Sequence, residues 1–172
     1  LFAQVTNPPL DAIREELVTS MGSTIGPEGN LLKPVAGSCR QIKIASAILD
    51  NEELAKLRYI DEHGFRSISI PMLFDARSGG LGLARALEDL QKRTSQAVAE
   101  GYTIIILSDR GVNFNLAPIP SLLAVASVHH PLVREGTRNR AAFVIEPGDA
   151  REGPPPAPLT RSGAGAVASR LA

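Results

Sequence analysis

The chain has 172 residues, enough for about one domain with a buried core. Lys+Arg and Asp+Glu balance at 18 each, so no basic face is indicated and nucleic acid is a poor candidate partner. No apolar run reaches the roughly 18 residues that a membrane span needs. Cys39 is the single cysteine, which excludes an internal disulfide and cannot alone hold an iron–sulfur cluster or a structural zinc.

The first third of the chain predicts one helix, one loop and one strand. Apolar residues recur at helical spacing over 10–21, after two prolines that exclude a helix before them, so this segment predicts an amphipathic helix. The segment 22–37 is rich in Gly and Pro and is typical of an irregular surface loop. Polar and apolar residues alternate over 41–44, which predicts a short strand.

The middle of the chain predicts two helices separated by a strand. Asp50 or Asn51 is expected to cap a helix that runs to about Arg58. Alternation over 65–70 predicts a strand ended by a proline. Apolar residues then keep near-helical spacing over 80–100, and the glycine that follows is a typical helix stop.

The last part of the folded pattern indicates parallel strands. The β-branched run 103–107 and the apolar run 141–145 are typical of strands buried on both faces. A helix is expected over 119–135, with Pro131 either kinking it or ending it early. Strands alternating with helices of 10–20 residues predict an α/β fold with right-handed crossovers. The pattern alone does not separate a partial (β/α) barrel from an open doubly wound sheet.

Ser108, Asp109 and Arg110 follow the buried run 103–107 directly, where α/β proteins gather their functional groups. Asp109 could act as a base or a ligand and Arg110 as an anion clamp, which would suit an independent small enzyme. The structural alternative is that Asp109 caps the next turn while Arg110 pairs with Asp109 or with a neighbour.

The other reactive side chains give weak signals. His129 and His130 are adjacent on a predicted helix and point about 100° apart, so they do not converge on one metal ion. A structural or interface role is the better interpretation. Cys39 has no histidine at a known catalytic spacing, and His63 beside a glycine is typical of a loop.

Three stretches of the sequence carry a resemblance to a known family. The run FAQVTNPPLDAIREE at 2–16 resembles a segment of the central domain of glutamate synthase, and GPEGNLL follows at 26–32. SDRG at 108–111 and PIPSLLAVASVHH at 118–130 resemble later stretches of the same domain. The chain is therefore identified as similar to that central domain over 1–150, which implies an α/β unit related to a partial (β/α) barrel.

The resemblance implies a division of labour in a larger cytoplasmic enzyme. Glutamate synthase converts glutamine, 2-oxoglutarate and reductant into two glutamates. Its glutaminase domain releases ammonia, and a tunnel leads to a synthase domain that carries FMN and a [3Fe-4S] cluster. The central domain connects the two and lines the tunnel, so this segment is expected to bind no cofactor or metal and to catalyse no step itself. Further partners of the parent would be a small NADPH-oxidising subunit or ferredoxin.

Thr6 and Asn7 are the tunnel-side residues that the resemblance suggests. A hydroxyl and a carboxamide held before two prolines form a rigid polar edge that suits hydrogen-bonded relay of ammonia. Turn formation is the alternative role, because Asn before Pro often begins a loop.

The tail 151–172 departs from the family. Its prolines at 154–156 and 158 exclude a helix where relatives have one, so the last strand is expected to be lost or frayed. A free-standing interaction or regulatory domain is therefore the alternative, with the proline-rich tail docking as a polyproline helix. The start at Leu1, without Met or signal peptide, suggests a fragment, whose uncovered apolar edges would favour self-association.

Overall fold

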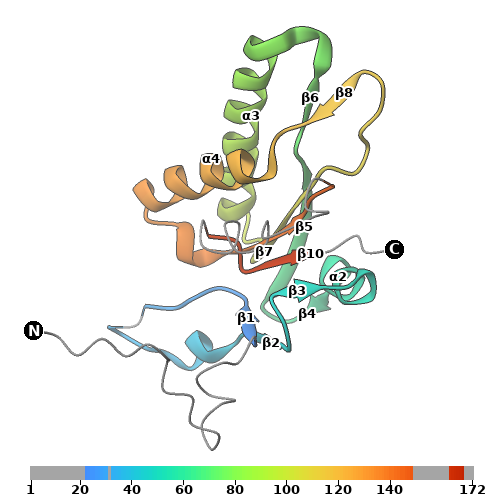
Figure 1. Ribbon diagram of the computed structural model, residues 1–172. Helices are drawn as coiled ribbons and strands as arrows, with labels where there is room; N and C mark the ends of the chain where they lie inside the picture. Colours follow the sequence, from blue (N-terminus) through green and yellow to red (C-terminus); the bar gives the residue numbers. More distant parts are fainter. Residues whose placement is uncertain (1–21, 31, 149–162, 169–172) are drawn as a thin grey trace, which may run out of the picture.

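The computed structural model describes residues 22–30, 32–148 and 163–168. Six strands form one sheet in the order β3-β10-β9-β7-β5-β4, and the sheet curls into a half-barrel (Figure 1). Every neighbouring pair is parallel except β4 with β5. The strands are β3 (Ile48–Leu49), β4 (Asp61–Glu62), β5 (Phe65–Pro71), β7 (Ile104–Ser108), β9 (Ala142–Glu146) and β10 (Ala166–Ala168).

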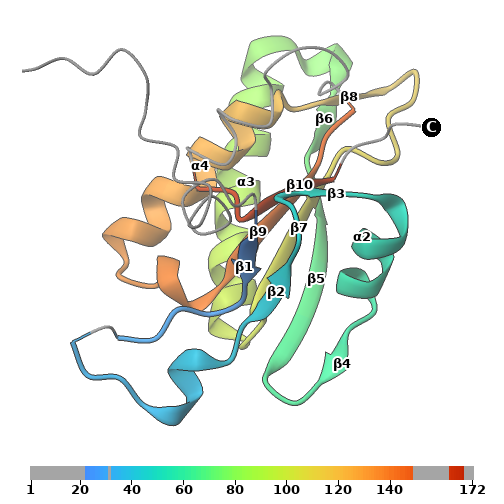
Figure 2. The same cartoon turned by 60° about the horizontal axis from the view of Figure 1, so that its bottom comes forward.

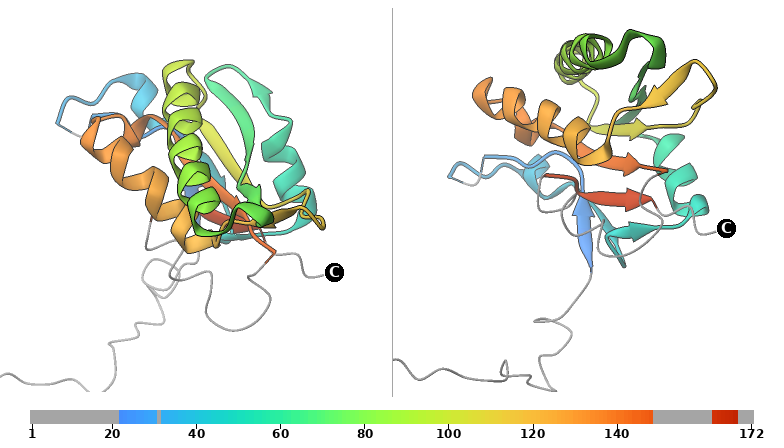
Figure 3. Two further views of the ribbon diagram at one scale, coloured as in Figure 1. Left: turned by 90° about the horizontal axis from the view of Figure 1, so that it is seen from above. Right: turned by 45° about the horizontal axis from the view of Figure 1, so that its top comes forward.

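Two long helices cover one face of the sheet, α3 (Gly79–Ala99) and α4 (Ser121–Arg134) (Figure 3). The core between them and the sheet contains Ile105 and Leu107 from β7 and Phe143 from β9. Because side chains alternate across a strand, the other residues of β7 and β9 point to the opposite face.

The opposite face carries a smaller second core. Ile104 and Ile106 of β7 pack there with Leu54 and Leu57 of α2 (Asn51–Arg58). A two-stranded antiparallel sheet, β1 (Ser23–Ile25) with β2 (Ile42–Ile44), lies against this face (Figure 2). The strands β7 and β9 are thus buried on both faces, as the sequence predicted.

A short antiparallel ribbon extends from the carboxyl end of the sheet (Figure 1). It pairs β6 (Leu73–Asp75) with β8 (Leu116–Pro118). Three 3-10 turns complete the described elements: η1 (Ala36–Cys39), η2 (Ala76–Ser78) and η3 (Arg138–Arg140).

Local signals account for most of these elements. Asp50 caps α2 by accepting from the Glu53 backbone N–H at 2.8 Å, and the Glu53 carboxylate accepts from the Asp50 N–H at 3.1 Å. This reciprocal capping confirms the predicted start of the helix. Gly101, at φ +85°, ends α3 as predicted, because a positive φ is accessible to glycine without strain.

Two expectations are wrong, and one alternative is excluded. The segment 22–37 is not wholly irregular, because β1 lies within it and pairs with β2 through non-local contacts. Of the two alternatives for Pro131, an early end of α4 is excluded, since the helix continues to Arg134. The last strand is not lost: β10 pairs with β9 and β3, and all three of its small residues are buried. The predicted helix 10–21 lies outside the described residues.

Candidate functional site

The strands β7 and β9 end side by side at Ser108 and Glu146, which are paired in register. Ser108 is 6% exposed and Glu146 is fully buried. Polar groups at the carboxyl ends of parallel strands are where α/β proteins build sites. This edge of the sheet is therefore the first candidate site.

Glu146 accepts three side-chain hydrogen bonds from three different elements. Ser108 Oγ and Arg58 Nη2 each donate to Glu146 Oε2 at 2.6 Å. Arg110 Nε donates to Glu146 Oε1. These four residues are called the Glu146 cluster below. A buried carboxylate that is paired on both oxygens is stabilised in its charged form.

The electrostatics of the Glu146 cluster favour a permanent ion pair. Burial acts to raise the pKa of Glu146, but the hydrogen bonds from Ser108 and Arg110 and the charges of Arg58 and Arg110 outweigh it, so the pKa lies below its usual value. A carboxylate with a lowered pKa and with donors on both oxygens is a poor general base. The geometry is that of a structural clamp.

Asp109 lies at the same carboxyl end of the sheet and is hydrogen-bonded there. Its side chain is buried, and Asp109 Oδ2 accepts from the Gly148 backbone N–H. Its own N–H donates to the Glu146 carbonyl at 3.3 Å. The structure thus brings Ser108, Asp109 and Arg110 together around β9. Arg110 pairs with Glu146, a neighbour in space rather than in sequence.

A second polar cluster surrounds Arg138 at the opposite end of β9. Arg138 Nε donates to His129 Nδ1 at 3.1 Å, and Nη1 donates to the Ala141 carbonyl at 2.8 Å. Nη2 donates to the Gly163 carbonyl, and the guanidinium carbon lies 4.4 Å from the Phe143 ring centroid. Arg138 therefore ties α4, η3 and the segment that leads into β10 to one another.

Two cavities adjoin Arg138. One of about 260 Å³ is lined by residues that include Ser23, Thr24 and Gly165. The other, of about 420 Å³, is lined in part by His129 and Val133. Each guanidinium nitrogen of Arg138 already donates to a described residue, so this side chain is engaged in holding the fold.

The histidines and the cysteine are dispersed. The rings of His129 and His130 are 5.3 Å apart and at 87° to each other, so they do not converge on one point. Cys39 is exposed. Within residues 22–30, 32–148 and 163–168, no group of three or more His, Cys, Asp or Glu side chains could hold a metal ion. In the same ranges, no helix has both the length and the apolar character needed to cross a bilayer. Thr6 and Asn7 lie outside the described residues.

Comparison with known families decides the identity. The sequence model of the glutamate synthase central domain matches residues 1–172. The chain belongs to this family.

Individual relatives agree with this assignment to the glutamate synthase central domain family. The chain is 42% identical to the glutamate synthase [NADPH] large chain of Bacillus subtilis, covering 100% of this chain and 11% of the relative. It is 43% identical to the glutamate synthase [NADH] of Schizosaccharomyces pombe, covering 100% of this chain and 8% of the relative. The ferredoxin-dependent glutamate synthase 2 of Synechocystis is 38% identical over 84% of this chain and 9% of the relative. The chain thus spans about a tenth of the length of these curated relatives.

Sequence reasoning missed two members of the Glu146 cluster of this central-domain chain. Glu146 directly follows the buried run 141–145, so the strand-end signal that drew attention to Ser108 could also have found Glu146. Arg58 carried no such signal. It ends α2, and only the curled sheet brings that helix end to β9.

Proposed function

We propose that the chain is the central domain of a glutamate synthase and connects the glutaminase domain to the FMN and iron–sulfur synthase domain. The observation that carries this proposal is full coverage of the chain at 42% identity by a relative of which it makes up only 11%. Such coverage is expected of one domain within a much longer polypeptide. The parent would convert glutamine, 2-oxoglutarate and reductant into two glutamates in the cytoplasm.

In this proposal the segment itself is a scaffold. The Glu146 cluster supports that role, because Arg58, Ser108 and Arg110 together occupy both oxygens of the Glu146 carboxylate and so stabilise the end of the sheet. FMN and the [3Fe-4S] cluster would belong to the synthase domain. Relatives named for NADPH, NADH and ferredoxin all match this chain, so the choice of electron donor would be made by other parts of the enzyme or by its electron-donating partner.

The proposal extends to the ammonia tunnel, with Thr6 and Asn7 on its wall. Thr6→Val and Asn7→Leu in the full-length enzyme should lower glutamate formed per glutamine hydrolysed, because each removes groups that hydrogen-bond ammonia. Thr19→Val, a change of the same chemistry on the predicted helix, is the control. If glutamate formed per glutamine hydrolysed is unchanged in both variants, Thr6 and Asn7 do not line the tunnel.

The first experiment is to follow the reading frame and assay its product for flavin, iron and glutamine-dependent glutamate formation. We expect all three in the full-length protein, and none in residues 1–172 alone. A frame that stops at residue 172 would favour a free-standing interaction or regulatory domain. Flavin binding or turnover by the 172-residue chain would overturn the scaffold role and make Asp109 and Arg110 the first residues to substitute.

A further inference from the structure

The loop that joins β7 to β8 exposes two apolar side chains. Phe114 is 93% exposed and Val112 is 51% exposed. The chain has only five phenylalanines, and Phe143 is fully buried. A large aromatic side chain held almost wholly in water is a common anchor of protein interfaces.

Hydrogen bonds within the loop fix its shape. Asn113 Oδ1 accepts from the backbone N–H groups of Asn115 and Leu116, at 2.9 and 3.1 Å. Asn113 Nδ2 donates to the Gly111 carbonyl at 3.2 Å, and the Asn113 N–H donates to the Leu116 carbonyl at 3.2 Å. The backbone beside Phe114 is thus ordered in advance, which lowers the entropy cost of binding through this side chain.

The base of the loop is equally constrained. The loop begins at Asp109 and Arg110, which are held against β9 through Gly148 and Glu146. Its far end continues into β8, and the Asn115 carbonyl accepts from the Ala76 N–H at 2.9 Å. The Glu146 cluster and the β6–β8 ribbon therefore support both ends of the loop.

We propose that Val112 and Phe114 form a docking surface for an apolar pocket on another domain of the same long polypeptide. This inference rests on the proposed function. The argument for that occupant is length: about nine tenths of each matched relative lies outside the part that aligns with this chain. A central domain that connects two others must present surface to them, and a rigid apolar loop at the carboxyl edge of the sheet is suited to this.

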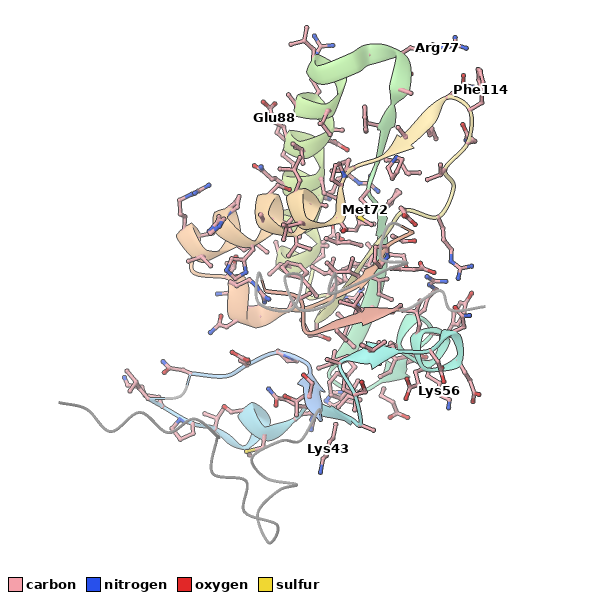
Figure 4. The ribbon with its side chains drawn as sticks, viewed as in Figure 1. Lys43, Lys56, Met72, Arg77, Glu88 and Phe114 are labelled. Atoms are coloured by element: carbon pink, nitrogen blue, oxygen red, sulfur yellow. The ribbon has the colours of Figure 1, made fainter. Side chains whose placement is uncertain are left out.

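Charge defines the rim of the surface. Arg77 lies at the same end of the molecule as Phe114 (Figure 4), and the contact between Ala76 and Asn115 joins their segments. Arg77 is exposed, and Arg110 is 55% exposed at the start of the loop. Asp75 is exposed beside Arg77, so the rim carries both charges, and the pocket that receives Phe114 should be bordered by polar side chains of both signs.

The test measures access to position 114 in the full-length gene product. Phe114→Cys and, separately, Tyr59→Cys are made in a Cys39→Ser background, and maleimide labelling at each position is followed by peptide mass spectrometry. Tyr59, at the end of α2 and 79% exposed, is the matched exposed aromatic. Position 114 should label about tenfold slower in the native protein than in guanidinium, because labelling then requires local opening. Position 59 should be labelled at similar rates in the native protein and in guanidinium.

A second measurement uses the melting temperature of the full-length protein. Phe114→Ser should lower the melting temperature, because the proposed pocket covers position 114 in the full-length protein. Tyr59→Ser should not lower it, because substitutions at positions that stay exposed are close to neutral. Fast native labelling at position 114, or equal protection at both positions, would overturn the docking surface. Glutamate formation by the same preparation tests the proposed function separately: an active enzyme with an accessible position 114 refutes only the docking surface. A gene product that forms no glutamate refutes the proposed function.

Discussion

Arg58 and Glu146 lie 88 positions apart in the chain, yet Arg58 Nη2 donates to Glu146 Oε2 at 2.6 Å. This bond links α2, on one face of the sheet, to the end of β9. The Arg58 carbonyl in turn accepts from Ser67 Oγ of β5 at 2.7 Å. Arg58 therefore connects α2 both to the first half of β5 and to the carboxyl end of β9.

Glu146→Gln should destabilise the protein by about 2–3 kcal/mol, because it leaves two arginines without the buried carboxylate that they share. The neutral amide keeps the size of the side chain, so packing changes little. Urea unfolding at pH 7, followed by circular dichroism, measures the loss.

The matched control for Glu146→Gln is Glu52→Gln on α2. Glu52 pairs with Lys56 at 2.9 Å, but both side chains are largely exposed. An exposed ion pair contributes little to stability, so the urea midpoint should barely move. Equal losses from both substitutions would mean that the Glu146 cluster is no stronger than a surface pair.

Acid should remove the contribution of the Glu146 cluster. The pKa of Glu146 in the fold is below its ordinary value of 4.5, so the stabilisation is fully present above pH 4.5 and is lost as the pH falls through the folded pKa. The free energy of unfolding should therefore fall less steeply below pH 4.5 in Glu146→Gln than in the parent protein. Parallel pH profiles from pH 7 to pH 3 would contradict the lowered pKa.

Local patterns predicted the elements that are determined by residues close to one another in the sequence. The β-branched run of β7 and the reciprocal cap between Asp50 and Glu53 each act within a few residues, so they could be read directly. The strands β1 and β10 escaped, since their pairing depends on distant partners.

The same limit applies to the candidate site. The sequence indicated Ser108, Asp109 and Arg110, because a charged group after a buried strand is a local signal. Their common partner Glu146 comes from the next parallel strand, and Arg58 comes from a helix on the other face. Such partners are set by how the sheet curls, which no local spacing encodes.

His129 should make stability sensitive to mildly acidic pH. Burial, followed by the charges of Arg138 and His130, lowers the pKa of His129 below its ordinary 6.5. Neutral His129 accepts the hydrogen bond from Arg138, so this stabilisation is present above pH 6.5 and is lost as the pH falls through the folded pKa.

His129→Gln tests this directly, because its amide oxygen can still accept from Arg138 but does not titrate. The variant should lose less stability than the parent between pH 7 and pH 5, as measured by urea midpoints. His130→Gln, at the adjacent exposed position, removes only the smallest of the three causes that lower the pKa of His129, so it should keep most of the parent's slope. A slope that survives His129→Gln and disappears in His130→Gln would assign the pH dependence to His130 and contradict this prediction.

Gly163→Ala should disrupt the approach to β10. Gly163 has φ +113°, and an added Cβ would lie 2.3 Å from His129 Nδ1, so both the backbone and the ring must shift. We expect a loss of about 2–3 kcal/mol, because L residues rarely adopt such a backbone conformation and the clash adds to that strain.

The neighbouring Gly165 supplies the control for Gly163→Ala. A Cβ there would meet the Phe143 carbonyl oxygen at 3.4 Å, an ordinary contact, and Gly165 does not have a positive φ. Gly165→Ala should therefore change stability by less than about 0.5 kcal/mol. Because Arg138 binds the Gly163 carbonyl, Gly163→Ala should also weaken the pH dependence that His129 imposes. Equal stability of the two alanine variants would show that the tight turn at Gly163 does not position β10.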